Sequence, residues 1–236
     1  MHFHFITIFP NMFTDYMNES VLGRASEKGV LGFSVYDVRD FAQNKWKKID
    51  DRPYGGGPGM VMEATPVLAA AKKAIGKKDR KKVKVVIMAP RGTQFTNELA
   101  RSWAKKYDHV VLIAGRYEGI DARVKKILRA EEISIGPYVV TGGELPALIV
   151  ADAVARQVPG VLGKEESREE DRVSSGEMYT RPETLEYEGK KYRVPKVLLS
   201  GDPKKIDAWK IDAERTRTRC RTYAETRKRN SMKEHR

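Results

Sequence analysis

The chain has 236 residues, 40% of them hydrophobic and 33% charged, and its formal net charge is +13. This length suits one large domain or a domain with a smaller second one. So large a charge indicates an anionic partner, most often nucleic acid, with an anionic membrane as the competing interpretation. No apolar run approaches the roughly 20 residues of a spanning helix, and no signal-peptide pattern opens the chain. With a single cysteine, Cys220, the composition favours a reduced cytoplasmic protein with no membrane partner.

The first 40 or so residues predict a strand, two helices and a second strand. The strands are residues 2–9 and 31–38, and the helices are residues 11–17 and 20–28. His2 and His4 alternate with phenylalanine in the first strand, a spacing at which two histidines could ligate a metal. No carboxylate or cysteine stands nearby in the sequence, so we expect them to be polar positions of an edge strand.

Residues 53–59 contain four glycines and two prolines and cannot form a helix or a strand. No Gly-Lys-Ser/Thr follows, which excludes a P-loop, and the glycine spacing is wrong for a dinucleotide-binding turn. An ordered functional loop and a flexible surface loop both remain open.

The middle of the chain alternates helices with strongly apolar strands. Helices are expected at 65–75, with Thr65 as N-cap, at 95–106 and at 121–130, and strands at 83–89 and 109–114. The basic run at 72–84 is a solvated face or a nucleic-acid contact. The alternation predicts a parallel α/β sheet whose ligand site lies at the carboxyl ends of the strands.

Residues 132–146 predict a short strand, a Gly-Pro break, a second strand and a Gly-Gly turn, followed by an apolar helix over 145–158. Thr141 and Glu144 have the spacing of a capping box. Gly136, Gly142 and Gly143 allow a ligand to approach the main chain closely. Together with the loops after Ala89 and Ala114, this segment is expected to hold a small-molecule cofactor.

The last third of the chain changes character. We expect a domain at 1–163, a flexible linker at 164–177 and a basic, mainly helical domain at 178–236, with two short β-like stretches around 192–199. Residues 204–236 hold 12 Lys or Arg against 5 Asp or Glu, with Trp209 and Tyr223 interleaved. This pattern favours nucleic-acid binding over a solvated helix face.

Five motifs, at 50–60, 115–121, 134–147, 152–163 and 179–182, span nearly the whole chain. On these motifs the chain resembles the bacterial tRNA (guanine-N1)-methyltransferases, which modify the guanosine at position 37, 3′ to the anticodon. The resemblance implies a SPOUT-type parallel sheet with a C-terminal deep trefoil knot, a feature that general topology rules would have excluded. It further implies a tRNA substrate and a homodimer with its active sites at the interface.

The resemblance also names the cofactor as S-adenosylmethionine and its site as three loops. The implied contact residues are Pro90, Gly115, Tyr117, Glu118, Ser134, Ile135, Gly136, Pro137, Tyr138, Val139, Val140, Gly142 and Leu145. Mg²⁺ assistance belongs to the family, although no residue set in the sequence has evident metal-site spacing.

Methylation of guanine N1 requires removal of the N1 proton and stabilisation of negative charge on O6. By resemblance Asp171 is the general base, and Arg156 stabilises O6 or orients Asp171. An ordinary helix ion pair with Asp152 is the alternative for Arg156. Only the family match selects Asp171 over Glu169 and Glu170.

The chain departs from the family pattern between Asp171 and Tyr179, where the linker is a few residues shorter and Met178 replaces a common histidine. Two other functions stay open on the sequence. One is a knotted RNA methyltransferase acting on another base or a ribose, which the glycine-rich loop at 53–59 disfavours. The other is a non-catalytic RNA-binding protein, which the presence of Arg156 and Asp171 disfavours.

Overall fold

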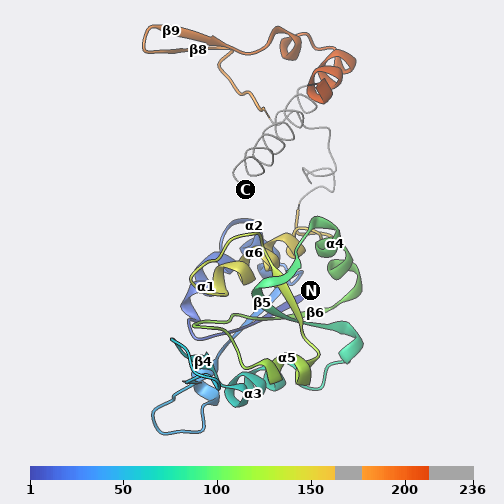
Figure 1. Ribbon diagram of the computed structural model, residues 1–236. Coiled ribbons are helices and arrows are strands. Elements are labelled where there is room, and N and C mark those ends of the chain that lie inside the picture. The colour runs from blue at the N-terminus through green and yellow to red at the C-terminus, as the bar shows by residue number, and fades with distance from the viewer. Residues whose placement is uncertain (163–176, 213–236) are drawn as a thin grey trace. The chain divides into compact units, whose positions relative to one another are not determined.

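The computed structural model describes residues 1–162 and 177–212. The chain divides into two compact units, Met1–Glu165 and Glu166–Arg236, and each is described by itself. The first unit is built on a five-stranded sheet in the order β2-β1-β6-β5-β7, in which all neighbours are parallel (Figure 1). The strands are β1 (His2–Thr7), β2 (Gly32–Asp37), β5 (Val83–Gln94), β6 (His109–Ile113) and β7 (Glu131–Ser134). The predicted parallel α/β sheet is confirmed.

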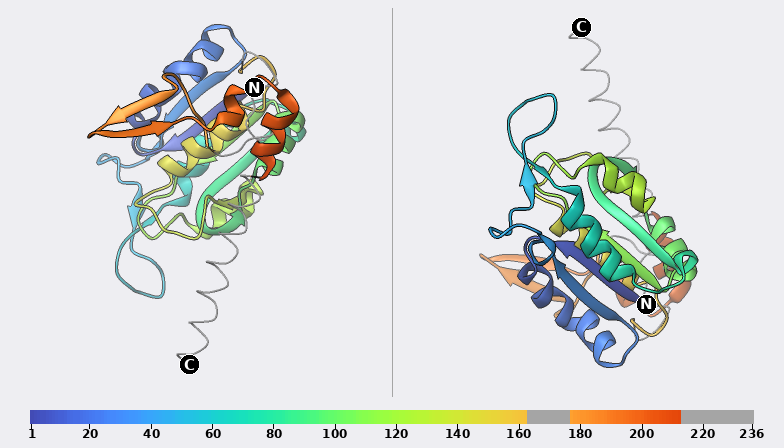
Figure 2. Two further views of the ribbon diagram at one scale, coloured as in Figure 1. Left: turned by 90° about the horizontal axis from the view of Figure 1, so that it is seen from above. Right: turned by 90° about the horizontal axis from the view of Figure 1, so that it is seen from below.

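Helices cover both faces of this sheet (Figures 1 and 2). One face carries α1 (Asn11–Asn18), α2 (Ser20–Glu27), α4 (Asn97–Lys106) and α6 (Glu144–Ala155); the other carries α3 (Ala64–Ile75) and α5 (Ala122–Leu128). Phe3 and Phe5 of β1 pack in the core under α1, α2, α4 and α6, whereas Ile6 packs in the core under α3 and α5. Because both faces of the sheet are covered, the inner strands β5 and β6 are largely continuous apolar runs over residues 83–89 and 110–113.

A small hairpin lies beside the sheet. Its strands β3 (Asp50–Asp51) and β4 (Val61–Met62) flank the glycine-rich loop, and two 3₁₀ turns, η1 (Val38–Phe41) and η2 (Arg80–Lys82), complete the unit. Among the residues that the structure describes, no helix is both long enough and apolar enough to span a membrane.

The described part of the second unit is residues 177–212. It contains an antiparallel hairpin of β8 (Thr184–Tyr187) and β9 (Lys190–Arg193), the 3₁₀ turn η5 (Lys196–Leu199) and helical residues from 203 to 212. The stretch expected to be β-like around 192–199 is therefore a strand only at residues 192 and 193. Pro195 lacks a backbone N–H for a strand ladder, and the 3₁₀ turn starts directly after it. The expected linker and the end of the basic helical domain fall mostly outside the described residues.

Three further predictions of local structure, at residues 138–140 and at the starts of α6 and α3, are wrong. No strand forms at residues 138–140, where Val139 is 79% exposed in an irregular segment. Helix α6 begins after Gly143 without a side-chain cap, because the Glu144 side chain is buried in tertiary contacts rather than folded back on the turn. Helix α3 begins one residue before Thr65, with Glu63 as its N-cap.

Strand β1 is an inner strand, not the expected edge strand, since β2 and β6 pair with its two sides. His4 is accordingly buried, with 3% of its surface exposed. Its Nδ1 lies 3.3 Å from the Tyr36 hydroxyl, and its Nε2 lies 3.2 Å from Nδ1 of His109. The histidines of this strand are thus satisfied by neighbouring strands.

Candidate functional site

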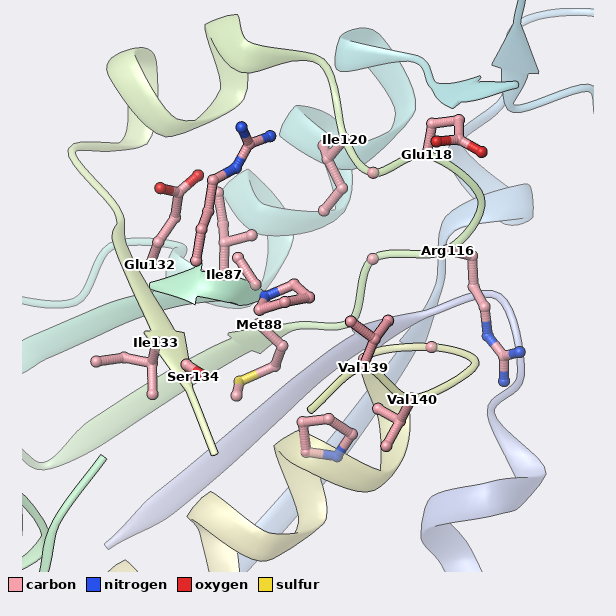
Figure 3. Close-up of a pocket in the computed structure, with 18 of the residues that line it drawn as sticks. Ile87, Met88, Arg116, Glu118, Ile120, Glu132, Ile133, Ser134, Val139 and Val140 are labelled. Atoms are coloured by element: carbon pink, nitrogen blue, oxygen red, sulfur yellow. The ribbon is translucent and has the colours of Figure 1, made fainter. Parts of the chain in front are cut away.

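A cavity of about 440 Å³ lies at the carboxyl ends of β5, β6 and β7 (Figure 3). Three loops form it: residues 89–91 within β5, residues 115–122 after β6, and residues 135–143 between β7 and α6. The carboxyl ends of neighbouring parallel strands meet at one edge of the sheet, which explains why loops distant in sequence converge here. The convergence predicted from the three Pro- and Gly-containing turns is therefore observed.

The first wall depends on an irregularity in strand β5. Ile133 of β7 is the register partner of both Met88 and Thr93, so the residues between them loop out of the ladder. Gly92 lets the two backbones meet, because a Cβ there would lie 2.5 Å from the carbonyl carbon of Glu132. The outward loop brings Pro90 and Arg91 to the cavity.

The other two walls touch each other through backbone. The amide of Gly143 donates a hydrogen bond to the carbonyl of Gly115 at 2.8 Å. A Cβ on Gly143 would lie 2.7 Å from Cα of Ala114, so only glycine permits this approach. The start of α6 is thereby pinned to the end of β6.

A buried ion pair reinforces the same junction. Glu144 is fully buried; its carboxylate accepts hydrogen bonds from Nε of Arg116 at 2.8 Å and from the Thr7 hydroxyl at 3.0 Å. Nη1 of Arg116 also donates to the Thr141 carbonyl at 3.3 Å, and its guanidinium lies 4.6 Å from the Phe9 ring centroid. Figure 3 shows this side chain pointing away from the cavity. Arg116 thus shapes the cavity through its backbone and ties the loop to α6 through its side chain.

The cavity combines apolar strand ends with carboxylates. Ile87, Met88 and Ile133 provide apolar wall, and Glu118 lies at its rim (Figure 3). Glu132 is paired with Lys125 at 2.7 Å. The hydrogen bond from the Arg123 side chain holds the pKa of Asp121 below its usual value, so this carboxylate stays ionised at neutral pH.

Glu118 differs from these carboxylates. Within residues 1–162 and 177–212 its exposed carboxylate forms no ion pair. Its backbone is fixed, because its amide donates to the Met60 carbonyl at 3.0 Å, next to the glycine-rich loop. A carboxylate held this way can accept hydrogen bonds from hydroxyls or pair with a cation.

Most of the cofactor contacts expected from the resemblance line this cavity. They are Pro90, Gly115, Tyr117, Glu118, Ser134, Ile135, Tyr138, Val139, Val140 and Gly142. Gly136, Pro137 and Leu145 do not line it: Gly136 lies against the Tyr138 ring, and the other two are exposed. The loops are therefore gathered as expected, and these three residues sit beside the cavity rather than in its wall.

Of the two residues expected to act on the base, only Arg156 lies within the described residues, and it does not line the cavity. Arg156 is half-buried at the C-terminal end of α6, about 15 Å along the helix from Pro146, which lines the cavity. Asp171 lies outside the described residues. No cluster of three His, Cys, Asp or Glu side chains able to hold a metal ion occurs in the described ranges.

Sequence reasoning missed several residues of the wall. Ile87, Met88 and Ile133 were assigned only to buried strands, yet each stands where its strand reaches the cavity. Arg116 and Asp121 belong to the motif at 115–121. Their charge next to its glycines was the signal that could have identified them as part of the site. No sequence signal indicated that Lys125 pairs with Glu132, since this ion pair joins a helix to the following strand.

Comparison with known proteins gives one consistent result. The family model described as tRNA (Guanine-1)-methyltransferase TrmD matches residues 1–227. A tRNA (guanine-N(1)-)-methyltransferase of Clostridioides difficile is 45% identical over 214 residues, which cover 89% of this chain and 90% of that protein. Proteins of the same name from Lachnospira eligens and Thermomicrobium roseum are 44% and 45% identical, covering 93% and 95% of this chain and 92% and 81% of theirs.

Proposed function

The chain belongs to the tRNA (guanine-1)-methyltransferase family, and from this membership we propose that it methylates N1 of the guanosine at position 37 of tRNA, with S-adenosylmethionine as the methyl donor. The observation that carries the proposal is the cavity at the carboxyl edge of the sheet, where the family motifs at 115–121 and 134–147 meet the loop at 89–91. The alternative, a non-catalytic RNA-binding protein, is not favoured, because such a protein has no need of this cavity.

The residues present fit the proposed cofactor. The cavity volume of about 440 Å³ lies within the range of small-molecule sites. Its apolar strand ends suit an adenine ring, and the exposed carboxylate of Glu118 can accept hydrogen bonds from ribose hydroxyls or pair with an ammonium group. When bound, S-adenosylmethionine supplies an electrophilic methyl group.

The remaining chemistry belongs to the side chains of the protein. Guanine N1 carries a proton at neutral pH, so a general base must remove it, and we assign this role to Asp171. Negative charge then develops on O6, and we assign its stabilisation to the guanidinium of Arg156. Mg²⁺ assistance stays a prediction from the family.

The position of Arg156 supports a homodimer. Its own chain places it at the opposite end of α6 from the cavity, so a second copy offers a way to bring guanidinium and cavity together. Helices α1 and α6 also expose apolar side chains at helical spacing: Met12 and Tyr16 on one, Leu145 and Ile149 on the other. The Tyr16 hydroxyl donates to Asp152 at 3.2 Å, which joins the two helices into one surface. An isologous contact over this surface would cover it.

The deep trefoil knot is likewise part of the proposal. Two close backbone approaches are compatible with it, Gly92 to β7 and Gly143 to the end of β6, since a threaded segment requires close passage of backbone. The basic residues 204–236 of the C-terminal domain would bind tRNA phosphates. The reaction would take place in the cytoplasm, where the substrate occurs.

The function is tested by methylation of tRNA transcripts. Purified protein with radiolabelled S-adenosylmethionine should label a transcript with guanosine at position 37, and a matched transcript with adenosine there should stay unlabelled. Calorimetry without RNA should detect cofactor binding. Absence of both cofactor binding and labelling would favour the RNA-binding alternative.

The assignment of the base is tested by Asp171→Asn. This change keeps the side-chain shape but removes the proton acceptor, so the single-turnover rate should fall by at least a hundredfold, the range of general-base contributions. Cofactor affinity should stay within about twofold. Glu169→Gln and Glu170→Gln are matched controls, since each removes one neighbouring carboxylate. A wild-type rate for Asp171→Asn, or an equal loss in the controls, would refute the assignment.

A further inference from the structure

Residues 44–48 form an ordered turn that precedes the β3–β4 hairpin. Oδ1 of Asn44 accepts hydrogen bonds from the amides of Trp46 and Lys48 at 3.1 and 2.8 Å, and its Nδ2 donates to the Lys48 carbonyl at 2.7 Å. Ile49, the next residue, is buried, and its carbonyl accepts from the amide of Glu63 at 2.8 Å. The turn is therefore closed on itself and anchored at its end.

This turn presents a tryptophan to solvent. The Trp46 side chain is 84% exposed, although tryptophan is highly buried on average. The Lys45 ammonium lies 5.7 Å from its ring centroid. The exposed ring therefore stands on a backbone whose conformation is already fixed.

The charges around the ring favour a nucleic-acid partner over a protein partner. Lys45, Lys47 and Lys48 are all exposed. Lys47 pairs with Asp40 at 3.1 Å and Lys48 with Asp51 at 3.3 Å, and exposed pairs of this kind contribute little and exchange readily. Lysine is depleted in the cores of protein–protein interfaces. An aromatic ring among lysines is instead typical of surfaces that bind single-stranded nucleic acid.

The turn is also connected to the cavity by backbone hydrogen bonds. Strand β3 follows it and pairs with β4, so that Asp50 lies opposite Met62. The amide of Met62 donates to the Gly119 carbonyl at 2.9 Å, and the amide of Asp121 donates to the Met62 carbonyl at 3.0 Å. The position of a ligand bound to the turn is thus fixed with respect to the loop at 115–122, which lines the cavity.

We propose that residues 45–48, which we call the Trp46 platform, bind the substrate RNA. The platform consists of Lys45, Trp46, Lys47 and Lys48. Trp46 stacks on an unpaired base, and the three lysines contact the flanking phosphates. The inference rests on the proposed function in that it takes tRNA as the substrate, and it adds a contact surface outside the cavity and outside the basic C-terminal region.

Trp46→Ala in the full-length protein tests the platform. At saturating cofactor the KM for tRNA should rise about tenfold, the loss expected from one base–aromatic stack, while kcat and cofactor affinity stay unchanged. Trp46→Phe keeps a ring and should recover most of the loss. Ile127→Ala, which truncates an exposed apolar side chain on α5, is the matched control and should leave the KM at its wild-type value.

Fluorescence provides a readout independent of methyl transfer. Subtracting the emission of Trp46→Phe from that of the wild type isolates the signal of Trp46, which stacking on a base should quench when tRNA is added. An unchanged KM with an unquenched Trp46 would overturn the platform even if the wild type methylates tRNA. Quenching by tRNA without methylation would support the platform and refute the proposed function. Weakened self-association of Trp46→Ala in sedimentation would assign the surface to a second copy and overturn the RNA contact.

Discussion

At the scale of single residues, a buried histidine on the inner strand β1 has a strongly lowered pKa. Burial, aided by the neighbouring charges of His2, Lys78 and His109, lowers the pKa of His4 to about 3. Burial also lowers the pKa values of His2 and His109. These three imidazole rings contact each other, and His4 also contacts Tyr36 of β2. The folded state therefore favours the neutral form of the histidines.

Stability should therefore fall as the pH is lowered through the histidine range. An unfolded histidine titrates near pH 6.5, whereas folded His4 stays neutral down to about pH 3. Between these values the unfolded state binds the additional proton, so the free energy of unfolding drops by about 1.4 kcal/mol per pH unit for this residue. Above pH 6.5 its contribution is constant. Urea unfolding at pH 7.5, 6.5 and 5.5 measures the slope above the range where carboxylates dominate.

His4→Gln is the control for this slope. Glutamine can still form hydrogen bonds with Tyr36 and His109 but does not titrate. Its stability at pH 7.5 will be lower, and its loss between pH 6.5 and 5.5 should be clearly smaller than that of the wild type, with His2 and His109 accounting for the remainder. Parallel slopes for the two proteins would show that His4 is not the source.

At the scale of elements, the sequence predicted most helices and strands but not how polar residues at their ends are used. Apolar periodicity located β1, β5, β6 and the helices because both faces of the sheet are buried. Thr141 and Glu144 have the spacing of a local capping box, yet Glu144 bonds to Thr7 and Arg116. Thr7 lies 137 residues from Glu144 in sequence, and no local pattern carries information about such a partner. Val139 and Val140 predicted a strand from their β-branched side chains, yet they lie in an irregular segment in which Val139 is 79% exposed.

The start of α6 should depend on this buried carboxylate. Glu144→Ala leaves Arg116 and Thr7 without their acceptor, and loss of one partner of a buried pair costs about 3–5 kcal/mol. Glu144→Gln keeps an acceptor of similar shape, so its loss should be smaller. Glu27→Ala, at an exposed position of α2, is the control and should stay within about 0.5 kcal/mol of the wild type. Urea unfolding midpoints measure all three.

A double-mutant cycle with Arg116→Met separates the pair from general damage. If the ion pair holds the junction, the double variant Arg116→Met/Glu144→Ala should be destabilised by less than the sum of the single changes. Strict additivity would mean that the two side chains do not stabilise each other. Because the junction joins two walls of the cavity, the same variants should also bind S-adenosylmethionine more weakly.

At the scale of the whole molecule, the class of sheet could be predicted but the order of its strands could not. Alternating helices and strands predict a parallel sheet, and the loops at its carboxyl edge predict a cavity. Strand order decides that β1 is internal, and only the folded chain reveals it. Arg156, to which we assign the stabilisation of O6, lies about 15 Å along α6 from the cavity wall of its own chain. The proposed homodimer would bring Arg156 of one copy to the cavity of the other, a consequence that can be measured in mixed dimers.

Heterodimers isolated with two affinity tags should reveal whether Arg156 serves the cavity of the other copy. Arg156→Ala removes the guanidinium, and Glu118→Arg reverses an exposed charge at the cavity rim, so each homodimer should be inactive. In the mixed dimer, the intact cavity of the Arg156→Ala chain would receive Arg156 from the Glu118→Arg chain. One of its two sites is then complete, and its methylation rate should be about half that of the wild type. A dimer of wild-type and Glu118→Arg chains, which also has one intact site, gives the matched reference. If Arg156 acts within its own chain, both sites of the mixed dimer are defective, and its activity will match that of the inactive homodimers.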